Sequence, residues 1–87
     1  MNKEKSELLI EMGQRIHIVR KEIKLTQIEL ASAAEISLTT LSETESGHIE
    51  PPFDLILYLA DHYNVSLNYL IVGESPMFKE REKKILY

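Results

Sequence analysis

The sequence predicts an all-α domain, and two observations carry this prediction. Apolar residues recur at intervals of three and four along most of the 87-residue chain, which is the spacing of one face of a helix. No segment shows the sustained alternation of apolar and polar residues that indicates a half-buried strand. The length suits one domain, which we expect to occupy residues 1–74, followed by a helical tail over residues 75–87.

Apolar spacing and a capping motif mark the first two helices. A first helix is expected over about residues 3–22. Its apolar stripe contains Leu8, Leu9, Met12, Ile16, Val19 and Ile23. Thr26, followed three residues later by Glu29, is a capping box that starts a second helix running to about Ala34. The residues expected to be buried in this helix are Ile28, Leu30 and Ala31.

The third and fourth helices are marked by a serine cap, a glycine and two prolines. Ser37 is placed to cap a third helix that ends at Gly47. Pro51 and Pro52 prevent this helix from continuing and prepare the entry to a fourth. The apolar side of the fourth helix is expected to contain Phe53, Ile56, Leu57, Leu59, Ala60 and Tyr63.

A short fifth helix and the tail complete the chain. The fifth helix is capped by Ser66 and covers residues 67–71, and the tail helix begins at Ser75. These two elements carry more apolar surface than so small a core needs, so we expect them to form a dimer interface. Its residues are Tyr69, Leu70, Ile71, Met77, Phe78, Ile85 and Leu86. The alternative is that the tail covers its own bundle.

The composition excludes several classes of protein. The chain has no cysteine, so it has neither a disulfide framework nor a thiolate metal site. No apolar run reaches the roughly 20 residues that span a bilayer, and we expect no membrane partner and a cytoplasmic location. His17 and His62 lack neighbouring ligands, and no nucleophile is paired with a base. We therefore expect no metal, no cofactor and no enzyme activity.

A series of motifs in fixed order spans Met12 to Gly73. They are residues 13–16, Arg20, residues 25–31, Ala34, Ile36, Ser37, Leu41, Ser42, Glu45, Gly47, Pro51, Leu59, Ala60, residues 65–67 and Leu70. In these residues the chain resembles the Cro and phage-repressor-type helix-turn-helix family, also called the XRE family. The resemblance implies a compact five-helix, lambda-repressor-like bundle whose second and third helices form the helix-turn-helix. It also implies that the third helix enters the major groove of double-stranded DNA.

Helical spacing divides the third helix into two faces. Leu41 and Thr44 point into the bundle. The outward residues, and hence the candidates for base readout, are Leu38, Thr39, Thr40 and Glu43. Thr39 offers a hydroxyl and a methyl group to a base edge, and Glu43 can accept a hydrogen bond from a cytosine amino group. The alternative is that Glu43 is only a solvated acid on an exposed face.

Phosphate contacts are expected at the start of the second helix. The resemblance implies that Gln27, together with the free backbone N–H groups there, binds a phosphate oxygen. The other candidates for phosphate contact are Ser37, Ser42, Arg15, Lys21 and Lys24. The resemblance also implies that Arg20 and Glu45 form a partly buried ion pair with a structural function.

Two positions depart from the family pattern. Glu35 stands where the family usually has a glycine, in a turn that needs a left-handed backbone. Thr44 replaces a branched aliphatic residue, and its hydroxyl therefore needs a partner inside the bundle.

The charge distribution leaves two functions open. The net charge is −4, and all ten lysines and arginines lie in Lys3–Lys24 and Lys79–Lys84. Because DNA affinity depends on cations that neutralise phosphates, a single copy should bind weakly. We therefore expect a transcriptional repressor that acts as a homodimer on a palindromic operator. The alternative is an acidic protein-interaction module, or an antitoxin that binds a toxin or another basic protein.

Overall fold

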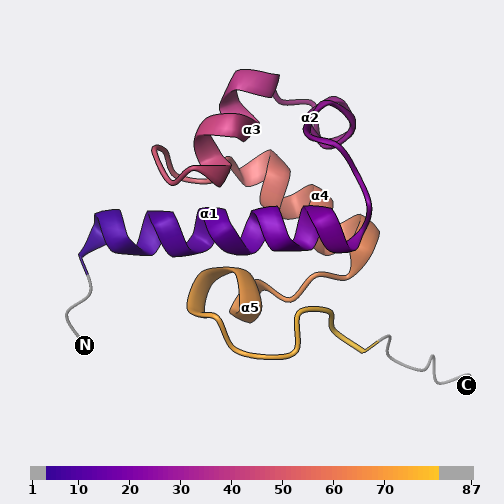
Figure 1. Ribbon diagram of the computed structural model, residues 1–87. Helices are drawn as coiled ribbons and strands as arrows, with labels where there is room; N and C mark the ends of the chain where they lie inside the picture. The colour runs from indigo at the N-terminus through magenta and orange to yellow at the C-terminus, as the bar shows by residue number, and fades with distance from the viewer. Residues whose placement is uncertain (1–3, 81–87) are drawn as a thin grey trace, which may run out of the picture.

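The computed structural model describes residues 4–80, which form five helices (Figure 1). These are α1 (Lys5–Glu22), α2 (Gln27–Ala34), α3 (Leu38–Glu45), α4 (Phe53–Tyr63) and α5 (Leu67–Val72). Helix α1 crosses the middle of the molecule, with α2 and α3 on one side of it and α5 on the other (Figure 1). The all-α prediction is confirmed for the described residues, whose only β pairing is one isolated bridge between Val65 and Phe78. None of the helices in this part of the chain is long and apolar enough to cross a membrane.

Side-chain caps fix where the helices start. The Thr26 hydroxyl accepts a hydrogen bond from the Glu29 N–H at 3.1 Å, and the Glu29 carboxylate accepts one from the Thr26 N–H at 2.8 Å. The predicted capping box is therefore confirmed. Ser37 caps α3 by accepting from the Thr40 N–H at 3.0 Å, and Ser66 caps α5 in the same way. Each cap satisfies an N–H group that has no partner within its helix.

A left-handed residue joins α2 to α3. Glu35 has φ 60° and ψ 41°, which is the conformation that a glycine would adopt without a steric penalty. The next residue, Ile36, donates its N–H to the Ala31 carbonyl at 3.0 Å and closes the end of α2. The turn that the sequence predicted is thus made without its usual glycine.

The core is contributed by all five helices. Its buried residues are Ile16, Val19, Leu30, Ala31, Ala34, Leu41, Leu55, Leu59, Val65 and Leu70. Four residues placed on the apolar helix faces are instead exposed, namely Leu8, Ile28, Phe53 and Leu57. In α4 the buried face is centred on Leu55 and Leu59, and residues two positions away from Leu55 lie on the opposite face of a helix.

The predicted tail helix is wrong over residues 75–80. Here the chain is not helical, and its backbone pairs with the segment between α4 and α5: Ser66 donates to the Met77 carbonyl at 2.9 Å, and Lys79 donates to the Asn64 carbonyl at 2.8 Å. Groups used in this pairing are not free for a helix. Met77 and Phe78 pack against the core of their own bundle. The rest of the predicted tail, including Ile85 and Leu86, lies outside the described residues.

Candidate nucleic-acid interface

Helix α3 presents a small polar face to solvent. Leu41 and Thr44 are fully buried, as the spacing predicts, and the Thr44 hydroxyl donates to the Thr40 carbonyl at 2.8 Å. Leu38, Thr39 and Glu43 are exposed. Thr40 is half-buried, and its hydroxyl oxygen accepts a hydrogen bond from Ser37 at 2.7 Å. Thr40 is therefore less available for readout than the other three candidates, whereas the exposed Ser42 lies between Leu38 and Thr39 on the outward face.

The backbones of α1 and α3 come into close contact at Gly13. A Cβ atom at Gly13 would lie 2.3 Å from the Thr44 carbonyl oxygen and 2.8 Å from that of Glu45. No side chain fits in this space, so the last turn of α3 rests directly on α1. In the sequence, Gly13 is marked only by its place in the family motif, and nothing local to it indicates this close contact.

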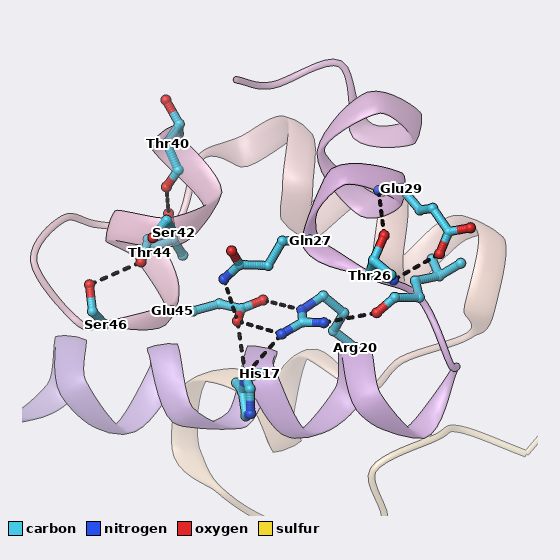
Figure 2. Close-up of polar contacts among 11 residues, drawn as sticks. His17, Arg20, Thr26, Gln27, Glu29, Thr40, Ser42, Thr44, Glu45 and Ser46 are labelled. Atoms are coloured by element: carbon cyan, nitrogen blue, oxygen red, sulfur yellow. Dashed lines mark hydrogen bonds and ion pairs between the residues drawn. The ribbon is translucent and has the colours of Figure 1, made fainter. Parts of the chain in front are cut away.

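The carboxylate of Glu45 joins three helices (Figure 2). Arg20 of α1 binds it through two guanidinium nitrogens, with Nε 2.7 Å from Oε2 and Nη2 3.1 Å from Oε1. His17 Nδ1 lies 2.9 Å from Oε1, and Gln27 of α2 donates to the same oxygen at 3.1 Å. Arg20 also donates to the Leu25 carbonyl at 2.8 Å. The ion pair implied by the resemblance is present, and it is nearly inaccessible to solvent, with side chains 8% and 5% exposed.

The surroundings of Glu45 favour its charged form. Burial raises the pKa of this carboxyl, but the hydrogen bonds from Arg20, His17 and Gln27, together with the Arg20 charge, outweigh burial and hold the pKa below its ordinary value. The charges of Arg20 and Glu45 are therefore committed to holding the helices together, and Arg20 is not available to a phosphate.

Gln27 lies at the start of α2 with its side chain turned towards Glu45 (Figure 2). A carboxylate only accepts hydrogen bonds, so the contact fixes the Gln27 amide with its nitrogen towards Glu45. One of the two amide hydrogens is used in this contact, and the second is left for another acceptor. The contacts of Gln27 and His17 with Glu45 are not predictable from the sequence, in which Gln27 is marked only as a candidate for phosphate contact.

The cations are divided between two sides of α1. Arg15 donates to the Leu70 carbonyl at 3.0 Å and lies 3.4 Å from Glu11, so it faces α5 and points away from α3. This position argues against the predicted phosphate contact of Arg15. Lys21 and Lys24 are exposed, and Lys21 follows His17 by one turn on the α3 side of the helix. Among the described residues, these two lysines are the cations nearest in sequence to α2 that remain available.

The predicted dimer residues are mostly used within the chain. Leu70 is fully buried, so its expected place in an interface is corrected. Tyr69, Met77 and Phe78 are partly buried against the core, and their place in an interface stays a prediction. Ile71 is 47% exposed and lines an apolar groove of about 410 Å³ between α1, α4 and α5. The other residues that line this groove are Lys5, Leu8, Leu9, Met12, Glu50, Pro51, Phe53 and Ile56.

No cluster of three or more metal-ligating side chains occurs in the range 4–80.

The candidate interface consists of a polar helix face, the amide-rich start of a neighbouring helix and two lysines. Such a surface fits the two-helix arrangement in which one helix enters a groove and the other contacts the backbone.

Comparison with known proteins agrees with this geometry. Residues 16–70 match the helix-turn-helix family model, so the chain belongs to the helix-turn-helix family of the Cro and phage-repressor type. The chain is 35% identical over 71 residues to the immunity repressor protein of Bacillus phage phi105, an alignment that covers 82% of this chain and 49% of that protein. It is 33% identical over 75 residues to the HTH-type transcriptional regulator ImmR of Bacillus subtilis (strain 168), covering 86% of this chain and 58% of the regulator. The chain therefore spans about half the length of these relatives.

Proposed function

We propose that this chain is a sequence-specific DNA-binding transcriptional regulator that acts as a repressor in the cytoplasm. The observation that carries the proposal is the outward face of α3, which is exposed and polar while its inward face is locked to α1 and α2 through Glu45. A rigidly held helix with free side chains is what base readout requires. Similarity to a protein named as an immunity repressor and to one named as a transcriptional regulator supports the same function.

Base readout is assigned to the exposed residues of α3. Thr39 supplies a hydroxyl that can donate or accept, and Glu43 accepts a hydrogen bond from the amino group of cytosine. Ser42, which the sequence predicted at a phosphate, is exposed on the same face, and we reassign its hydroxyl to readout. Leu38, 45% exposed, offers an apolar contact to a thymine methyl group. Glu43 repels phosphates, so it favours DNA binding only where a base amino group meets it.

Phosphate binding is assigned to the start of α2 and the end of α1. Gln27 has a second amide hydrogen beyond its contact with Glu45, and it belongs to the first turn of α2, whose backbone N–H groups attract an anion. Lys21 and Lys24 add the charge that releases counterions from DNA. Ser37 contributes little, because its hydroxyl already caps α3 and donates to Thr40.

Two lysines per chain give a weak electrostatic contribution, so we propose that the regulator binds as a homodimer. The apolar groove between α1, α4 and α5 is the surface that we assign to the second copy, in place of the buried Leu70. Lys5 and Glu50 form an ion pair of 2.6 Å among the residues that line it. Because the groove carries both signs of charge, two identical grooves can face each other across a two-fold axis without repulsion.

Selection from a randomised duplex library, followed by fluorescence anisotropy at several salt concentrations, tests the proposal. We expect an enriched palindrome whose half-sites are separated by about 34 Å, or one helical turn. The logarithm of the association constant should fall with the logarithm of salt concentration by about 0.9 per phosphate contacted. If no sequence is enriched and no saturable binding occurs even at low salt, the chain is not a DNA-binding regulator.

Substitutions on α3 test which of its side chains recognise the bases. Thr39→Ala and Glu43→Gln should each relax preference at particular base positions, at a cost of about 1–3 kcal/mol for the preferred base. Glu22→Gln removes an exposed acid from α1 and serves as the matched control, which should leave preference unchanged. Unaltered preference in both α3 variants would remove α3 from the readout.

The scarcity of free cations favours a second candidate function. Arg15, Arg20 and Lys5 each bind a partner within the chain. The same fold could then present its acidic surface to a basic protein, as an antitoxin presents itself to a toxin. A chain that shows no sequence preference for DNA but forms a saturable complex with a basic protein would support this candidate over the repressor.

A further inference from the structure

The outer face of α4 is not covered by any other described segment. Leu57 is 51% exposed on this face, although its apolar side chain led us to expect burial. Asp54 and Asp61 lie three and four residues away from Leu57, so the three side chains share one face of the helix. An exposed leucine flanked by two acids is a surface that an apolar and basic segment would complement.

This face borders a hollow of about 260 Å³ between α4 and the end of α2. Ala33 and Ala34 form its wall on α2, and Tyr58 lines it from α4. Glu35 stands at its edge in the left-handed conformation, which costs about 1 kcal/mol for a residue other than glycine. The lining of the hollow therefore combines apolar side chains with the carboxylates of Glu35, Asp54 and Asp61.

The acids around this hollow are not neutralised by lysine or arginine. The sequence has neither residue from Leu25 to Phe78. Among the described residues, Glu35 and Asp54 form no ion pair, and Asp61 has only the exposed His62 at 3.8 Å. Three negatively charged carboxylates attract a basic partner. Salt screens this attraction least when the charges are in direct contact.

The chain itself contains a segment of the complementary kind. Residues 81–87 read Arg-Glu-Lys-Lys-Ile-Leu-Tyr, so three cations and one acid are followed by Ile, Leu and Tyr, and the segment keeps an excess of positive charge. We propose that this segment docks on the outer face of α4 and in the hollow beside α2, with Arg81, Lys83 and Lys84 facing the acids. The segment would then be unavailable to DNA phosphates, so the proposal stands whether or not the chain binds DNA.

The point where the described chain ends places this segment within reach. Lys79 is hydrogen-bonded to Asn64 through the backbone, and Asn64 directly follows α4. From Asn64 back to Asp54 is ten residues of helix, or about 15 Å along the axis. Seven residues span up to about 23 Å when extended, which is enough to follow α4 over that length.

Paramagnetic relaxation in the full chain tests the docking. The sequence has no cysteine, so Tyr87→Cys accepts a single nitroxide label. We expect the amide signals of Ala33, Leu57 and Asp61 to lose most of their intensity relative to the reduced label, whereas those of Leu9 and Met12 in the apolar groove keep theirs. The loss should disappear in Asp54→Asn/Asp61→Asn and in Lys83→Glu/Lys84→Glu.

Matched controls separate docking from general electrostatics. Glu22→Gln/Glu74→Gln removes two exposed acids elsewhere and should leave the signal loss in place. The amide spectrum of each variant shows whether it is folded. Signal loss that persists without Asp54 and Asp61, that falls on the apolar groove, or that arises only between a labelled and an unlabelled copy in a mixture would overturn the proposal.

Discussion

Arg20 forms more hydrogen bonds than any other cation in the described residues. Its removal should therefore lower the free energy of unfolding. Arg20→Ala leaves the carboxylate of Glu45 buried without its main partner, which typically costs about 3–5 kcal/mol. We expect a decrease of this size in the free energy of unfolding measured with urea. Lys21→Ala, which removes the adjacent exposed cation, is the control and should change stability by less than about 0.5 kcal/mol. Equal effects of the two substitutions would contradict the structural function of Arg20.

Glu45 should make stability depend on pH in the acid range. Its pKa in the folded chain is lowered from 4.5, so its ionised form favours folding. This contribution is fully present above pH 4.5 and is lost as the pH falls through the lowered pKa of the folded state. Urea unfolding of the wild type and Glu45→Gln should show a stability difference that is largest near neutral pH and shrinks in acid. A difference that stays constant with pH would show that Glu45 does not titrate differently in the two states.

Individual contacts were predictable only where a known motif ties two residues together. The pairing of Arg20 with Glu45 followed from the family resemblance, and it is present. The direction of Arg15 and the contact of Gln27 with Glu45 were not foreseen, because each depends on which neighbouring helix packs beside the residue. His17 precedes Arg20 by three residues, and this helical neighbour relation was the only signal for its place beside Glu45.

At the scale of elements, Gly13 determines how closely α3 approaches α1. Alanine normally stabilises the interior of a helix by about 0.5–1 kcal/mol relative to glycine. At this position the added methyl group would meet two backbone carbonyls of α3, which cannot move aside as a flexible side chain does. We therefore expect Gly13→Ala to destabilise the fold by about 1–3 kcal/mol, as overpacking does. Gln14→Ala at the exposed next position is the control, and a stabilising effect of Gly13→Ala in urea unfolding would contradict the close contact.

Helix positions followed from local chemistry, but burial did not always. The capping box at Thr26 and the serine caps at positions 37 and 66 were read correctly, because a cap acts on backbone groups within its own turn. Phe53 and Leu57 were placed inside because they are apolar, although only one face of α4 meets the core. Residues 75–80 pair with the segment after α4, and nothing in their own sequence specifies that partner.

At the scale of the whole molecule, α1 separates two groups of cations. Lys21 follows His17 by one turn on the side of α3, whereas Arg15 donates to the Leu70 carbonyl of α5 on the other side. The sequence showed where cations are missing along the chain, but only the arrangement of helices shows that Arg15 cannot add to the charge around α3. The electrostatic contribution of one chain to DNA binding is therefore smaller than a count of its nearby lysines and arginines indicates.

Because one chain makes only a small electrostatic contribution to DNA binding, the proposed regulator depends on dimerisation. Phe53 is 73% exposed in the apolar groove, and Phe53→Asp would place a charge in the proposed contact between two copies. We expect this variant to be monomeric by sedimentation and to bind the selected duplex with about half the salt dependence of the wild type, since one chain contacts half as many phosphates. Ile18→Asp changes an equally apolar residue, 46% exposed on α1 and outside the groove, and should leave both properties unchanged. A Phe53→Asp variant that remains dimeric would place the two-fold contact on another surface.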